Sequence, residues 1–79
     1  PCWLLPQPQP LIERQGQLWQ GAARFVLRSR PERIEAGWFD DEPTCRDYHI
    51  ASGPGDRLAW VFKDHRGAEP AWFLHGWFG

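Results

Sequence analysis

Apolar and polar residues alternate with a period of two along most of this chain, and this alternation limits the folds open to it. Phe25 and Leu27 alternate with arginines, and the same spacing recurs in CRDYHIAS at 45–52 and RLAWVFKD at 57–64. Because successive side chains of a β-strand point to opposite faces, each segment predicts a strand with one face turned inward. The turn residues GPGD between the last two segments predict a β-hairpin.

The chain is therefore expected to be all-β. The pattern predicts a small antiparallel meander that forms a strongly curved sheet or a partly open barrel of five or six strands. Only the stretch 15–26 leaves a weak helical alternative open. The predicted core comprises Phe25, Leu27, Ile34, Tyr48, Ile50, Leu58, Trp60, Phe62, Trp72 and Leu74.

The first ten residues, PCWLLPQPQP, contain four prolines, which fix φ and remove backbone donors. Residues 1–16 are therefore expected to form an extended arm or linker, and residues 17–79 a single small β domain. Trp3, Leu5 and Leu11 are too apolar for a free tether, so the arm should pack on the domain or pair with a strand edge. A chain of 79 residues that starts without methionine is expected to be a C-terminal fragment of a larger protein.

The last predicted strand, within AWFLHGWFG at 71–79, is apolar on both faces. Alternation directs Trp72, Leu74 and Phe78 inward, and it leaves a second apolar face that either the Pro-rich arm or a partner protein must cover. We expect a partner protein to cover Trp77, because interfaces concentrate Trp at their hot spots. The candidate partner-binding residues are Phe73, His75, Trp77, Phe78, Trp38 and Phe39.

The net charge of −1, from 9 Lys and Arg against 10 Asp and Glu, excludes the strongly basic class of nucleic-acid binder. Arginines nevertheless cluster near aromatic residues, a combination found where single strands stack on exposed rings. Arginine at alternate positions is equally typical of a solvent-facing strand. The candidate nucleic-acid contacts are Arg24, Arg28, Arg30 and Arg33.

No motif in the chain predicts catalysis, a metal or a cofactor. The acidic run at 40–42 lies in a predicted loop, where carboxylates are usually solvated. Cys45 and His49 are four residues apart on a predicted strand, about 13 Å by strand rise, too far to share one zinc ion. Cys2 and Cys45 are expected to be reduced, as in a cytoplasmic protein. No apolar run has the length of a membrane span, and we expect no enzyme activity.

Five stretches of the chain together match a known family pattern: PCWLLPQPQPL, RPERIEAGWF, RDYHIA, RLAWVFKDHRG and WFLHGWFG. The most specific parts are PERI at 31–34, GW at 37–38, RDY at 46–48 and WFLHG at 72–76. In these parts the chain resembles the extreme C-terminal region of ImuB, a bacterial relative of the Y-family (DinB/UmuC-like) lesion-bypass polymerases. It departs from that pattern at Phe39, His49 and Trp77.

The resemblance implies a function without catalysis. ImuB proteins lack the catalytic carboxylates of polymerases and act as hubs in SOS-induced translesion synthesis. They hold the sliding clamp, a RecA-like accessory protein of the ImuA type and an error-prone C-family polymerase. The chain is therefore expected to be a protein-interaction module that docks the accessory protein, the polymerase or both, with the clamp bound through regions outside it. A DNA-binding β module tethered to a polymerase-like body is the alternative, and a cap that packs back on the polymerase-like domains is a third reading.

Overall fold

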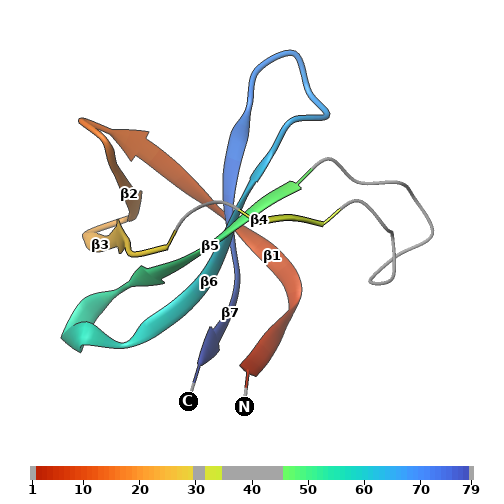
Figure 1. Cartoon of the computed structure of the whole chain (residues 1–79). Helices are drawn as coiled ribbons and strands as arrows, with labels where there is room; N and C mark the ends of the chain where they lie inside the picture. The colour runs from red at the N-terminus through yellow and green to blue at the C-terminus, as the bar shows by residue number, and fades with distance from the viewer. Residues whose placement is uncertain (1, 30–31, 35–45, 79) are drawn as a thin grey trace.

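The computed structural model describes residues 2–29, 32–34 and 46–78 (Figure 1). Within these residues the regular elements are strands and one turn of 3₁₀-helix. The elements are β1 (Cys2–Arg14), β2 (Gln17–Gln20), β3 (Ala23–Leu27), β4 (Glu32–Ile34), β5 (Arg46–Ser52), η1 (Pro54–Asp56), β6 (Leu58–Asp64) and β7 (Ala71–Phe78).

Six of the strands close into an antiparallel barrel in the order β1-β2-β3-β5-β6-β7. The first and last strands pair from Cys2 opposite Phe78 to Leu11 opposite Trp72, and β3 pairs with β5 to complete the ring. The two chain ends consequently lie at the same end of the barrel (Figure 1). The predicted all-β meander is confirmed, and the barrel is closed because the N-terminal segment supplies a strand.

Strand β4 lies outside this ring and pairs with the first half of β5, where Glu32 is opposite Tyr48 and Ile34 is opposite Arg46. The second half of β5 pairs with β3 through Ala51 and Ser52. One edge of β5 is therefore shared between two partners, and β4 extends the sheet beyond the barrel.

Two tight turns build the first three strands into a meander. Gln15 and Gly16 connect β1 to β2 with φ of 54° and 77°, the signs of a type I′ hairpin turn. Gly21, with φ of 59°, begins the two-residue turn into β3. The helical alternative for residues 15–26 is therefore wrong, because positive φ at these positions favours hairpins over a continuous helix.

The Pro-rich segment is part of the barrel rather than an arm beside it. β1 pairs with β7 along much of its length and with β2 at Ile12 to Arg14, which confirms the expectation that this segment pairs with a strand edge. Residues 5–8 have no ladder partner on β7, and β2 reaches no further than Ile12. Pro6 and Pro8 are tolerated because this part of β1 is a sheet edge, where a missing N–H removes no ladder bond, and Pro10 is in register with Phe73 on β7 but has no strand partner on its other side.

The core inside the barrel draws on every strand of the ring. Its buried apolar residues are Leu11, Leu18, Phe25, Ala51, Ala59, Val61, Trp72 and Leu74, and Leu5, Ala23, Leu27 and Trp77 pack against them. The sequence predictions for Phe25, Leu27, Trp72 and Leu74 are confirmed, and Tyr48 and Phe62 are buried as predicted, at 3% and 1% exposure, although outside this cluster. Ile34 was also predicted to be in the core, but its side chain lies outside the described part of the chain.

The predicted inward face of β6 is wrong. Ala59 and Val61 are the interior residues, whereas Trp60 and Phe62 face outward and Leu58 is 44% exposed. Alternation could not choose between the two sets, because both are apolar. A six-stranded barrel is narrow, and large rings from other strands already fill it, so only the smaller set fits inside.

The inward face of β5 is also reversed, here against the polar residues Asp47 and His49 that alternate with Tyr48 and Ile50, because β5 follows the register it shares with β6. Tyr48 and Ile50 are the register partners of Phe62 and Trp60, so all four lie on the outer face. The interior position is taken by Ala51, which is fully buried opposite Ala59.

An irregularity in β7 changes the direction of its last residues. Trp60 is opposite Gly76 while Val61 is opposite Leu74, so His75 is an extra residue that forms a β-bulge. A bulge shifts the alternation by one position. Trp77 therefore turns inward against the core, contrary to the sequence prediction.

Phe78 was predicted to face inward, and the same bulge makes this prediction wrong. One residue beyond Trp77, it lies on the outer side of the barrel, opposite Cys2.

Candidate functional site

The outer face of β5, β6 and β7 carries a compact aromatic cluster, which we call the outer cluster. It consists of Tyr48, Trp60, Phe62, Phe73 and His75. Tyr48 lies 4.5 Å from Trp60 between ring centroids, and the Trp60 and His75 rings stack at 5.4 Å. Although they point away from the barrel interior, Tyr48, Phe62 and His75 are 3%, 1% and 6% exposed. The second face of β7 is thus largely covered within the chain.

Hydrogen bonds connect the polar atoms of the outer cluster. Arg46 Nη1 donates to the hydroxyl of Tyr48 at 3.3 Å, and that hydroxyl lies 2.8 Å from His75 Nδ1. Burial, together with the positive charge of Arg46, lowers the pKa of His75 below 6.5 and favours the neutral imidazole. Because Arg46 can only donate, Tyr48 accepts from it and is left to donate to Nδ1.

The guanidinium of Arg46 also lies over the Phe62 ring, 4.4 Å from its centroid. Packing and hydrogen bonding therefore give this group of residues a structural role.

A second surface lies where β1 and β6 begin and β7 ends, and we call it the terminal patch. It comprises Leu4, Leu58, Trp60 and Phe78, while the exposed Trp3 borders it from the other face of β1, where it is opposite Trp77. Trp3 is 65% exposed, Leu4 47% and Leu58 44%, and the other two are half-buried. Leu4 and Trp60 flank Gly76 in register, so the outer residues form a continuous row across three strands.

A third surface is the outer side of β1, β2 and β3, which we call the β2–β3 face. Because Leu18 and Phe25 point into the barrel, their neighbours point outward: Ile12, Trp19 and Arg24 are directly paired across the three strands. The guanidinium of Arg14 lies 5.0 Å from the centre of the Trp19 ring. An aromatic ring thus stands between two arginines on an outward-facing sheet.

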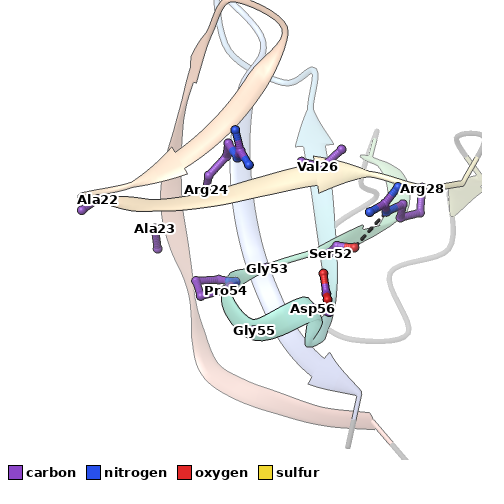
Figure 2. A pocket seen from close by; sticks show the side chains of 10 residues that line it. All are labelled: Ala22, Ala23, Arg24, Val26, Arg28, Ser52, Gly53, Pro54, Gly55 and Asp56. Carbon is purple, nitrogen blue, oxygen red and sulfur yellow. Dashed lines mark hydrogen bonds between the residues drawn. The ribbon is translucent and has the colours of Figure 1, made fainter.

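A groove extends the β2–β3 face toward β5. Its volume is about 420 Å³, and it is lined by β3 on one side and by the turn at 53–56 on the other. Figure 2 shows Arg24, Val26 and Arg28 along the β3 side, with Arg28 reaching across to Ser52. Arg28 Nε donates to Ser52 Oγ at 2.8 Å, which fixes this guanidinium at one end of the groove.

Two pairs of titratable side chains lie near the loop after β6. His65 Nε2 lies 2.8 Å from Asp47 Oδ2, and Arg66 Nη2 lies 3.0 Å from Asp64 Oδ2. Burial raises the pKa of Asp64, but hydrogen bonds from Arg66 and the charges of Arg66 and Arg46 outweigh it, so the pKa lies below 3.8. Among the described residues, no group of three or more His, Cys, Asp or Glu side chains is placed to hold a metal ion.

The candidate partner-binding residues of the sequence lie in different environments. His75 is buried in the outer cluster, Phe73 is half-buried beside Phe62, and Trp77 packs against the barrel core. Phe78 belongs to the terminal patch. Trp38 and Phe39 lie outside the described residues, as do the acidic run at 40–42 and Cys45.

The structure brings together two of the four candidate arginines, Arg24 and Arg28, at one groove. Arg33 lies on β4 opposite Asp47, with its side chain not described, and Arg30 is outside the described residues. Sequence reasoning missed Arg14 and Trp19. Both residues face outward on the two strands that the turn at residues 15 and 16 connects. Their proximity could be predicted only if this turn had been recognised as a hairpin.

No protein-family model matches this chain, and the comparisons with curated proteins and with solved structures give no match either. Within the described residues, no helix has the length and apolar character needed to cross a membrane.

Proposed function

We propose that this barrel is a non-catalytic protein-interaction module of an ImuB-like hub in translesion synthesis. Its partner is the RecA-like accessory protein of the ImuA type, the error-prone C-family polymerase, or both. The resemblance of the sequence to the C-terminal region of ImuB supports this choice of partners. A bacterial cytoplasmic location belongs to the same proposal, because the replication machinery works there.

The observation that supports docking is the terminal patch. Exposed large apolar side chains are uncommon as a contiguous group on a small soluble domain, and such groups mark interaction surfaces. Leu4 projects from β1 and Leu58 from β6, on either side of β7, and Trp60 presents a half-buried ring beside them. Aromatic anchors surrounded by aliphatic contacts are typical of interface hot spots.

The outer cluster supplies the rigid support that such a surface needs. Trp60 belongs to both groups, and its ring packs against the rings of Tyr48 and His75, which also contact each other. Fixing a ring before binding reduces the conformational entropy lost when a partner docks. The interacting residue is therefore preorganised, although its neighbours in the outer cluster are themselves buried.

The test measures binding of the chain to the accessory protein and to the polymerase, one at a time, by isothermal titration calorimetry. Leu4→Asp combined with Leu58→Asp should weaken binding about 30-fold, the equivalent of the hot-spot threshold. Ile12→Asp is the matched control, because Ile12 is 63% exposed and lies on the β2–β3 face. The function is wrong if neither protein binds, or if the control weakens binding as much as the double variant.

A further inference from the structure

The β2–β3 face has a different composition from the terminal patch and lies on another side of the barrel. Around the ring β2 is opposite β6, and β3 is opposite β7. A ligand on this face would leave the terminal patch free. The inference that follows is therefore independent of the proposed protein docking.

We propose that the β2–β3 face is a binding site for single-stranded nucleic acid. Trp19 would stack with one base, while Arg24 and Arg28 contact the phosphates of the strand along the groove. Proteins that bind single strands without sequence preference combine these two elements, an exposed ring and a positively charged track.

The positive charges on this face are concentrated and available. Within the described residues, the exposed Arg24 side chain makes no hydrogen bond or ion pair, and the Arg28 side chain bonds only to the hydroxyl of Ser52. Among the residues that line the groove, Asp56 is the one carboxylate, and no ion pair joins it to either arginine. Glu13 lies on the opposite face of β1 from Arg14, because adjacent residues of a strand alternate.

The ring is positioned for stacking. Trp19 is half-buried, so its edge is anchored in the sheet, and the guanidinium of Arg14 already occupies a flat site over it. A base has a larger aromatic surface than a guanidinium and would replace it on the ring. The displaced Arg14 would then meet a neighbouring phosphate, which makes three arginines available to the strand.

The spacing along β3 suits an extended strand. Arg24 and Arg28 are separated by four residues, about 13 Å in a β-strand, with the small apolar side chain of Val26 between them. The groove of about 420 Å³ continues in the same direction and is bounded by the turn at 53–56. The positive charge of this groove is a local feature, in a chain whose net charge is −1. Duplex DNA, which hides its bases, should therefore bind much more weakly than a single strand.

The test is fluorescence anisotropy with a labelled thymidine 12-mer, titrated with the full chain at several salt concentrations. Three neutralised phosphates predict a slope of log K against log salt of about −2 for a single strand. Arg24→Gln combined with Arg28→Gln should reduce that slope to about −0.7 and weaken binding at least about tenfold at low salt. Trp19→Leu should weaken binding about 5- to 150-fold with little change in slope.

Controls separate this site from general charge effects and from unfolding. Lys63→Gln with Arg66→Gln removes the same charge from the end of β6 and the loop that follows it, and should leave the affinity unchanged. Trp19→Phe keeps an aromatic ring and should retain most of the binding if Trp19→Leu proves unstable. The proposal is wrong if the oligonucleotide does not bind at low salt, or if the charge-matched control weakens binding equally. It is also wrong if a duplex binds as well as the single strand, or if the arginine variant loses a protein partner instead.

Discussion

Gly76 should be one of the least replaceable residues in the barrel, because β1 passes directly over it. A Cβ atom at this position would collide with the carbonyl oxygen of Trp3 and lie 3.1 Å from the Cα of Leu4. The obstacle is backbone rather than a flexible side chain, so β1 would have to move away from β7. Gly76→Ala therefore tests the close approach of the first and last strands, on which barrel closure depends.

The magnitude follows from two opposing effects. Overpacking usually costs about 1 to 3 kcal/mol, and a backbone obstacle puts Gly76→Ala near the upper end. Alanine also restricts the unfolded chain, which returns about 0.4 to 1 kcal/mol. We therefore expect a net loss of about 2 kcal/mol, which corresponds to a fall in Tm of about 8 to 16 °C for a domain of this size.

Thermal and urea denaturation followed by circular dichroism would measure the loss, and hydrogen exchange would show whether Cys2 to Leu4 lose protection first. Gly67→Ala is the matched control, because a Cβ there comes no closer than 3.4 Å to its nearest neighbour and φ is not positive. The control should be neutral or slightly stabilising. A Gly76→Ala variant that melts within about 2 °C of the parent, with β1 still protected, would show that the strands do not approach so closely.

Three further outcomes follow from the packing. Val61→Asp should prevent stable folding, because this side chain is fully buried, whereas Leu58→Asp should change the free energy of unfolding by less than about 1 kcal/mol. If urea denaturation shows equal effects for the two variants, the inward face of β6 is wrongly assigned. Trp77→Ala should lower the free energy of unfolding by about 3 kcal/mol, because the variant loses the contact with Phe25. An unchanged Tm would instead favour the partner-facing role predicted from the sequence. The pKa of His75 in the folded state lies below 6.5, so just below that pH the unfolded chain binds more protons than the folded one. Stability should therefore fall as the pH drops through 6.5, until the folded pKa is passed. His75→Asn should flatten this dependence of stability on pH, and a dependence that persists in the variant would belong to another group.

Local sequence determined the strands and most of their turns. Alternation around Phe25, the GPGD turn and the aromatic content all specify β structure through interactions between near neighbours. They therefore predicted an all-β meander and, on β3, the correct inward residue. The arginines at 24 and 28 were recognised for the same reason, since their outward positions follow from the same alternation.

The tertiary structure alone decided which face of each strand is inside. Strands β6 and β7 are apolar on both faces, so the choice there depended on the volume left inside a narrow ring, and β5 followed the register of β6 against its own polar alternation. In that ring Ala51 and Ala59 leave room for Phe25 and Trp72. The larger residues of β5 and β6 then formed the outer cluster, an arrangement that no single strand encodes.

The bulge and the closure also depend on residues far apart in the chain. Trp77 turns inward because His75 is an extra residue opposite β6, and Gly76 allows β1 to approach. Prolines that suggested a separate arm became acceptable in β1 because its outer edge makes no ladder bonds there. Likewise, Trp19 gained its place beside Arg24 only when β2 and β3 paired. Sequence fixes what each segment prefers locally, whereas register, bulges and the available volume decide which surfaces the folded barrel presents.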